Sequence, residues 1–452
     1  MKRTTKLIIA TSLGTALLAA ACGDNTSTTA SDQPDTNAPS VSITNVAVDR
    51  DTLDSATDTT ISLPDGWYEM AGYGNVLHVD GDDITSHYVT TSTCVTGDTI
   101  DNELPVDHAD DDGGVITVDL VGPTTDYRLV PLASPLTCDS DEADTLLALD
   151  EVFATHYPFF DQRGFDWASA MTELRDAGDT DSFDEVFAEL LVELGDGHTT
   201  FEGLDIDPDL DSFGLPGITT LDDLDTAIGA EFDRVLASVG DITADETGSV
   251  AWGRLDADTG YLIMVAFEGI SGTEGDPLAD LAALRAALDQ AVADLGDVDR
   301  LVIDMRFNGG GYEDLATTAA GYFVDEATPG YRKWAHAQPD AFVQTVVIEP
   351  EAAFFDGQIA VVTSPITASA AEAFTLAMVE VADAAVIGNP SFGEFSDAID
   401  WVLPNGTEFT LSMENYTDLT GINHEATGIP VDIPAPFDQA IDTAIDHLTP
   451  DN

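Results

Sequence analysis

The sequence predicts an α+β protein of several domains, in which an N-terminal antiparallel β domain and a helical segment precede a layered α/β core. Three observations predict this order: short strand-like runs fill residues 59–138, apolar residues recur at helical spacing in 141–202, and strands alternate with helices in 248–452. An acidic segment with one helical stretch, 203–247, joins the last two parts. The chain has 452 residues, 44% of them hydrophobic, enough for two or three domains with full cores.

The β domain is predicted from runs of β-branched and aromatic residues separated by Gly, Asp and Pro, which is typical of an antiparallel meander or a small barrel. Its histidines, His78, His87 and His108, are isolated among strands and turns, so we expect no metal site there. The predicted strands are 67–70, 75–79, 87–91, 115–120 and 127–132.

Two amphipathic helices are predicted in the helical segment, and an aromatic loop, 157–167, lies between them. The second helix ends in Gly195-Asp-Gly-His-Thr199. Because glycines terminate a helix, His198 is presented from a fixed position, which suits a base. The apolar positions are Leu146, Leu147, Leu149, Val152 and Phe153 in the first helix, and Phe183, Val186, Phe187, Leu190, Leu191 and Leu194 in the second.

The core is predicted from apolar strands that alternate with Ala- and Leu-rich helices, a pattern that favours a layered sheet with some parallel pairing. The predicted strands are 249–253, 260–265, 301–304, 359–363 and 385–388, and the predicted helices are 278–295, 315–323 and 370–381.

The first residues have the pattern of a secretory signal. A basic start, 1–6, is followed by a short apolar run, 7–20, and by Ala19-Ala-Ala-Cys22. A cysteine directly after small residues resembles a bacterial lipobox, which implies cleavage before Cys22, lipidation of its thiol, and a lipoprotein of the bacterial cell envelope, periplasmic or on the outer face of the membrane. The alternative is an ordinary signal, cleaved nearby. Residues 23–58 then read as a flexible acidic tether.

The charge is strongly one-sided, with 85 acidic against 14 basic residues and a net charge of −71. The acidic residues are spread along the whole chain, which indicates a halophilic surface adapted to a salty medium, with a cationic partner as the alternative. A nucleic-acid partner is not expected, because phosphates would be repelled by this field.

Two cysteines remain once Cys22 is set aside as a lipid anchor. In an oxidising compartment we expect Cys94 and Cys138 to form a disulfide around the N-terminal domain. Two free, buried cysteines are the alternative, and neither cysteine has the neighbours of a metal site or of a catalytic thiol.

Two segments about 60 residues apart carry the strongest chemical signal. The buried strand 301–304 runs into the glycine turn 309–311, whose N–H groups can face a ligand. Ser369 lies at the start of an alanine-rich helix, where free N–H donors favour an oxyanion. Together they resemble a nucleophile and its oxyanion donors. Taken singly, the glycines could form only a tight turn and the serine only a helix cap.

A serine nucleophile needs a general base, and histidine is the best candidate in this chain. Lys333 is the one lysine beyond the signal segment, and we expect it at the surface. His198 has the strongest setting and His424, beside Glu425, is a rival. We expect His156 to pack among aromatic residues.

Five segments carry a family resemblance when they are taken in sequence order: 157–161 with Asp166-Trp167, 195–199, 304–311, 367–372 and 425–433. In this order they resemble the C-terminal-processing and tricorn-type serine peptidases, a group that also includes the repeats of interphotoreceptor retinoid-binding protein. The resemblance spans about residues 145–435. It implies a ClpP/crotonase-like catalytic core, no cofactor or metal, and a peptide or protein substrate.

Carried over residue by residue, the resemblance implies that Ser369 is the nucleophile and His198 the base. The N–H of Ala370, with one from Gly309 or Gly310, would form the oxyanion hole.

The resemblance also assigns two glutamates. Glu372 would orient or polarise the site, and Glu425 matches a glutamate that supports the histidine. There are two departures from the family pattern. Glu394 stands where the processing branch has a lysine, which excludes a Ser–Lys dyad and implies the histidine branch. Gly197 stands where tricorn-like members can carry a serine, which leaves the partner of Glu425 open.

Two functions follow from this reading. The first is a membrane-tethered serine endopeptidase that cleaves peptides or unfolded protein by acyl transfer. The second is an inactive binding module of the same fold that holds a peptide or an apolar ligand. The presence of Ser369, His198 and both glutamates favours the enzyme. The sequence does not indicate an oligomeric state.

Overall fold

The computed structural model describes residues 60–112, 114–138, 144–177, 183–201, 218–273, 275–337 and 342–449. The predicted signal, Cys22, the tether and the first part of the acidic connecting segment lie outside the described residues. Within them, no helix is both long and apolar enough to cross a membrane.

The N-terminal domain is an eight-stranded antiparallel sheet, as the fold prediction stated. Its strand order is β1-β6-β7-β8-β2-β3-β4-β5, and one face buries a small core around Tyr68, Val79 and Ile84. The strands are β1 (Thr60–Ile61), β2 (Gly66–Met70), β3 (Asn75–Asp80), β4 (Asp83–Val89), β5 (Cys94–Asp101), β6 (Leu104–Asp112), β7 (Val115–Leu120) and β8 (Asp126–Pro131).

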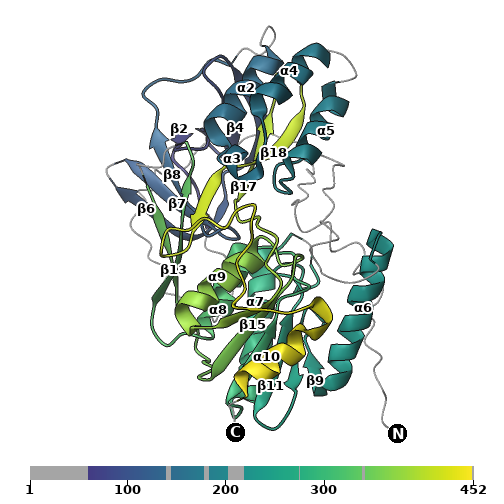
Figure 1. Ribbon diagram of the computed structural model, residues 1–452. Helices are drawn as coiled ribbons and strands as arrows, with labels where there is room; N and C mark the ends of the chain where they lie inside the picture. The colour runs from purple at the N-terminus through teal and green to yellow at the C-terminus, as the bar shows by residue number, and fades with distance from the viewer. Residues whose placement is uncertain are drawn as a thin grey trace.

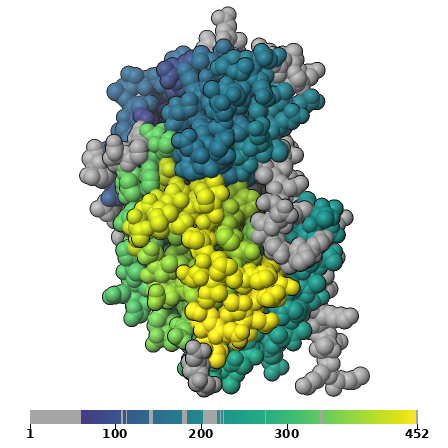
Figure 2. Space-filling view, in the orientation of Figure 1, coloured from purple at the N-terminus to yellow at the C-terminus, as the bar shows by residue number. Residues whose placement is uncertain are grey.

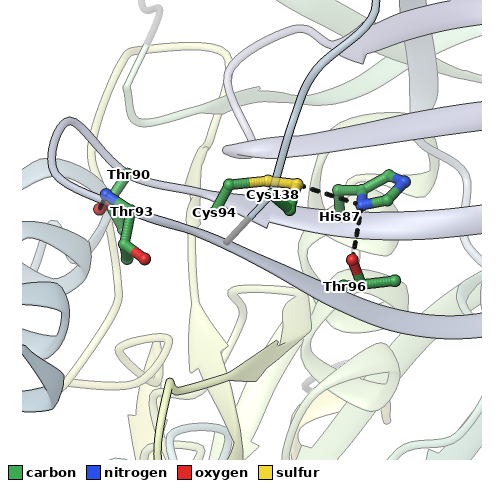
Figure 3. Close-up of a disulfide and its surroundings, with 6 residues drawn as sticks. All are labelled: His87, Thr90, Thr93, Cys94, Thr96 and Cys138. Atoms are coloured by element: carbon green, nitrogen blue, oxygen red, sulfur yellow. Dashed lines mark hydrogen bonds between the residues drawn. A yellow bond between two sulfur atoms is a disulfide. The ribbon is translucent and has the colours of Figure 1, made fainter. Parts of the chain in front are cut away.

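A disulfide joins Cys94, at the start of β5, to Cys138, in the segment that leads from the sheet toward the helices (Figure 3). His87 lies against it, with Nδ1 3.4 Å from Cys138 Sγ. Among the described residues, these three side chains are the one group of potential metal ligands that lie close together. Because the two sulfurs are bonded to each other, the group offers no thiolate.

The helical part packs on a hairpin from the far end of the chain (Figure 1). The hairpin, β17 (Ala398–Val402) and β18 (Glu408–Ser412), lies beside the helices, and Phe409 contacts the rings of Phe153 and Phe187. The helices are α2 (Thr145–His156), α3 (Phe160–Arg163), α4 (Trp167–Ala177) and α5 (Phe183–Leu194).

The α/β core is built on a seven-stranded sheet of order β20-β16-β15-β12-β11-β10-β9. The five strands from β11 to β20 are parallel, and β9 and β10 extend the sheet with antiparallel pairs. The strands are β9 (Gly240–Ala244), β10 (Val250–Arg254), β11 (Thr259–Met264), β12 (Arg300–Asp304), β15 (Gln358–Thr363), β16 (Ala385–Gly388) and β20 (Ile433–Pro434).

Both faces of this sheet are buried, because successive side chains of a strand point to opposite faces. In β12, Leu301 and Ile303 face one side and Val302 the other. The first side is covered by α7 (Pro277–Leu295), α8 (Glu313–Gly321) and α9 (Ala370–Ala382), and the second by α6 (Leu221–Ser238) and α10 (Ala440–Leu448).

A small sheet connects the core to the N-terminal domain, with β13 (Thr328–Ala335) between β14 (Gln344–Ile348) and β19 (Glu414–Thr417). Figure 2 shows the yellow C-terminal part of the chain directly below the blue helical part. Figure 1 shows β13 reaching up from the core toward the N-terminal sheet.

Lys333, on β13, is buried, so its expected surface position was wrong. Its Nζ lies 2.6 Å from Glu313 and 3.7 Å from Glu414, and it donates to Tyr416. Glu414 in turn bonds Tyr73 of the N-terminal domain. The buried position of the lysine provides the counter-charge for Glu313 and Glu414, which would otherwise be buried without a cation.

Replacement of Lys333 by Ala should therefore destabilise the protein. The change leaves Glu313 and Glu414 buried without their cation, and we expect the free energy of unfolding to fall by about 3–5 kcal/mol. Urea unfolding at constant high salt measures the loss. Arg254→Ala is the control, because its pair with Asp297 is exposed to solvent and should contribute little. Equal effects of the two variants would contradict the prediction.

Candidate active site

The turn before α9 holds Ser369 in a strained conformation. Its φ of 55° and ψ of −127° are unusual for a residue other than glycine. Two hydroxyl groups attach the turn to the backbone that follows β12: Thr367 Oγ1 donates to Met305 O (2.9 Å), and Ser364 Oγ donates to Arg306 O (2.7 Å). The serine side chain is therefore placed by the end of the neighbouring strand β12.

The glycine turn after β12 lies directly against Ser369. A Cβ placed on Gly310 would be 2.6 Å from the Cβ of Ser369, so only glycine fits there, and its φ of 116° also favours glycine. The Gly310 N–H donates to Asn308 Oδ1 (2.8 Å). Among the hydrogen bonds of the described residues, the N–H groups of Gly309 and Ala370 have no partner. These two N–H groups are therefore candidate oxyanion donors.

A buried arginine stabilises the backbone between β12 and the glycine turn. Arg306 pairs with Asp304 (2.7 Å) and Glu231 (2.8 Å), and it donates to the carbonyl of Phe437. Tyr261 adds a hydrogen bond to Asp304 (2.8 Å). With charges paired and no solvent contact, this network gives the turn a fixed starting point.

The histidine motif after α5 is held by Asp196. Its Oδ1 accepts the N–H groups of His198 (3.1 Å) and Thr199 (3.2 Å) and the hydroxyl of Ser412 (3.0 Å). Its Oδ2 accepts the Tyr157 hydroxyl (2.8 Å). The loop that carries the imidazole is thus tied to both the aromatic loop and the β18 strand.

The His198 ring is oriented by a backbone carbonyl. Its Nδ1 lies 2.7 Å from Ser396 O, and the residue is only 8% exposed. Because a carbonyl oxygen can only accept, Nδ1 is the nitrogen that carries the proton in the neutral ring, and the lone pair is then on Nε2. This is the tautomer that a general base requires.

Residues 393–396, here called the clamped segment, are hydrogen-bonded to both Ser369 and His198. Two buried glutamates accept its four consecutive N–H groups: Glu372 accepts those of Gly393 (2.7 Å) and Glu394 (2.8 Å), and Glu425 accepts those of Phe395 (2.9 Å) and Ser396 (3.2 Å). Glu372 also accepts the N–H of Ser369 (3.1 Å). The two predicted glutamates are therefore brought together on one stretch of backbone.

The same segment sets the distance between the candidate nucleophile and base. Ser369 N–H donates to Glu394 O (3.0 Å), and His198 Nδ1 donates to Ser396 O. These two carbonyls are two residues apart, a span of at most about 7 Å. The serine and the imidazole thus share one anchor, although they lie far apart in the sequence.

Glu425 does not contact the imidazole among the hydrogen bonds of the described residues. Its Oε1 accepts from Arg163 (2.7 Å), and its Oε2 holds the clamped segment. It can support His198 indirectly, through the backbone that carries Ser396 O and through Arg163. Arg163 also lies 3.7 Å from Asp196 and donates to the carbonyl of Gly195.

Burial changes the acidity of these carboxyl groups. It raises the pKa of Glu372 to about 7. Burial, together with the charge of Asp196, raises the pKa of Glu394 and of Glu425 to about 8, although Arg163 acts in the opposite direction. With one guanidinium among several carboxyls, the group retains protons at neutral pH.

The other histidines have different surroundings. His156 is buried near Trp401, with a centroid distance of 5.3 Å, and burial lowers its pKa to about 4. His424 lies 3.3 Å from Asp418. Of the two, His424 is the rival base that sequence reasoning left open.

Sequence reasoning gave no role to Arg163, Asp196 or the carbonyl of Ser396. Asp196 lies inside the histidine motif, and Arg163 lies in the aromatic loop. A signal for Arg163 existed, because a cation placed between two motifs is unusual in a chain with 14 Lys and Arg residues. A backbone carbonyl has no side-chain signal that could have found it.

The raised pKa values predict that stability falls as the pH rises toward 8. In the folded protein Glu394 and Glu425 hold their protons to about pH 8, whereas the ordinary value is 4.5. Between these limits the native protein binds more protons than the unfolded chain, so the free energy of unfolding decreases with pH, by up to about 1.4 kcal/mol per pH unit for each proton.

The decrease should be measured from about pH 7.5 to about pH 8, where histidines of lowered pKa are neutral in the folded protein and nearly all neutral in the unfolded chain. Urea unfolding of the wild type and of Glu394→Gln at constant salt compares the two slopes, and the variant should be the less steep. A wild-type stability that rises over this range would contradict the prediction.

A search of solved structures finds the same fold in a protein of Parabacteroides merdae described as a candidate peptidase. It is 21% identical, with a TM-score of 0.54, and the match covers 68% of this chain and 97% of that one. Mature CPAF, solved with lactacystin, matches at 10% identity and a TM-score of 0.48, covering 67% and 95% of the two chains. The tricorn protease matches at 13% identity and a TM-score of 0.38, and the match covers 84% of this chain and 46% of that one.

The model of peptidase family S41 matches residues 258–435. This range includes β12, the glycine turn, Ser369, the clamped segment and Glu425, but not His198. Residues 258–435 are therefore similar to the core of the S41 peptidases, and this match supports a serine peptidase.

Proposed function

We propose that this peptidase acts as an endopeptidase on peptides or unfolded protein, with Ser369 as nucleophile and His198 as general base. The observation that carries the proposal is the shared anchor: both residues bond carbonyls of the clamped segment, and the bond to Ser396 O leaves Nε2 of His198 free to accept a proton. Geometry and tautomer support the same pair.

In the acylation step, Ser369 Oγ attacks the scissile carbonyl carbon and its proton passes to His198 Nε2. The carbonyl oxygen becomes an oxyanion, for which the N–H groups of Gly309 and Ala370 are the donors. When the tetrahedral intermediate collapses, the C–N bond breaks and His198 donates the proton to the leaving amine. The product is an ester on Ser369.

In the deacylation step, a water molecule attacks the ester and gives a proton to His198 Nε2. The new carboxylic acid leaves as the proton returns to Ser369 Oγ, so the enzyme regains its first state. Glu372 and Glu425 contribute by holding the clamped segment, so that neither partner has to reorganise during the reaction.

We also propose that the protein is exported and tethered to a membrane through lipidated Cys22. The signal-like start and the lipobox-like segment support this, and the Cys94–Cys138 disulfide fits an oxidising compartment.

Loss of either side chain should abolish reaction with a serine-directed fluorophosphonate probe. In high salt, we expect Ser369→Ala and His198→Ala each to lower the labelling rate by at least about 10³-fold, because the serine is inert without its base. Peptide-library cleavage should fall in parallel. His424→Ala is the matched control and should be labelled.

Labelling that survives in His198→Ala but not in His424→Ala would make His424 the base. A well-folded wild type that is not labelled would favour the inactive binding module instead.

Replacement of Cys22 should release the protein from the membrane. In a host that processes lipoproteins, the wild type should incorporate labelled fatty acid and sediment with membranes, because two acyl chains or more anchor a protein stably. Cys22→Ser should do neither, while Cys94→Ser, which removes a disulfide cysteine instead, should still be acylated. Acylation of Cys22→Ser would contradict the tether.

A further inference from the structure

Glu394 is bonded to both halves of the candidate site. Its side-chain Oε1 accepts the N–H of Gly197 (2.6 Å), in the loop that carries His198. Its carbonyl accepts the N–H of Ser369 (3.0 Å), and its own N–H donates to Glu372 (2.8 Å). One residue therefore joins the loop of the base to the turn of the nucleophile.

The contact with Gly197 leaves no room for a side chain. A Cβ built on Gly197 would overlap the Glu394 carboxyl group, whose Cδ would lie only 3.0 Å away. The φ of Gly197 is not in the left-handed region, so the requirement for glycine there comes from the carboxyl group and not from backbone strain. The two departures from the family pattern are thus in contact: the carboxyl group of Glu394 fills the space that a side chain at position 197 would need.

The carboxyl group cannot move aside easily. Glu394 is only 4% exposed, and the charged groups that act on it are Asp196 and Arg163 on the histidine side and Glu372 and Glu425 on the side of the clamped segment. A buried acceptor that is removed leaves its donor unsatisfied, which would free the Gly197 backbone to shift.

We propose that Glu394 is a positioning residue of the peptidase, whose side chain aligns the His198 loop with Ser369, and that Gly197 is its required counterpart. The inference rests on the proposed function, because it assigns Glu394 an effect on the Ser369–His198 pair. Glu394 does not touch the reacting atoms. It acts through the loop backbone next to the base.

The test compares Glu394→Ala with Glu394→Gln. Without the acceptor, we expect kcat on a peptide substrate and the fluorophosphonate labelling rate to fall about 10–100-fold, with KM unchanged, since the base is displaced but the substrate surface is not. The Gln variant should stay within about threefold of the wild type, because its amide oxygen accepts the same N–H.

Glu313→Gln is the matched control. Glu313 is an equally buried glutamate paired with Lys333, outside the candidate site. It should lower the urea midpoint without slowing labelling. If Glu394→Ala slows labelling no more than this control does, or if Gln is as slow as Ala, the positioning role is overturned.

A second measurement does not depend on activity. Gly197→Ala should lower the urea midpoint clearly in the wild type and much less in Glu394→Ala, where the carboxyl group no longer fills the space. Equal shifts in the two backgrounds would overturn the pairing of Gly197 with Glu394.

The two experiments also separate this inference from the proposed function. If the wild type is labelled and Glu394→Ala is labelled equally fast, the proposed function stands and the positioning role of Glu394 is overturned. If a folded wild type is not labelled, both the proposed function and the positioning role are overturned. The unfolding measurements on Gly197→Ala, Glu394→Ala and the double variant would still decide whether Gly197 and Glu394 interact.

Discussion

Four consecutive backbone N–H groups, held by two buried glutamates, are the interaction on which the rest of the site depends. Glu372 and Glu425 bind the N–H groups of residues 393–396, while the carbonyls of Glu394 and Ser396 accept from Ser369 and His198. A backbone stretch without regular secondary structure thereby has all four of its N–H groups hydrogen-bonded. The backbone that follows β12 is held by Arg306 and supports the other side of the candidate site, at the glycine turn.

This arrangement concentrates buried carboxyl groups around the candidate site. Among the described residues, Arg163 is the one cation paired with Glu425 and Asp196, and burial raises the pKa of Glu394 and Glu425. Burying several carboxyl groups together costs free energy. These groups nevertheless accept hydrogen bonds that fix the positions of the histidine loop and the clamped segment. Position, and not charge, is what these side chains contribute.

Much of the core could be predicted because its signals are local. The strand expected at 301–304 is β12, Arg300–Asp304, and the helix expected at 370–381 is α9, Ala370–Ala382. The fold class and the family followed from such segments. Lys333 could not be placed, because Glu313 and Glu414 converge on it from distant parts of the chain. The role of Ser396 O was hidden for the same reason, since pairing across more than 190 residues has no trace in local composition.

The hairpin of β17 and β18 has a consequence for the order of folding. Phe409 completes the aromatic packing of Phe153 and Phe187, and Ser412 reaches Asp196 in the histidine motif. The helical part is synthesised more than 200 residues before the strands that finish its interior, and contacts of such long sequence separation form late. We therefore expect the histidine loop to reach its final position only after β18 has been synthesised, so that the candidate site assembles late in folding.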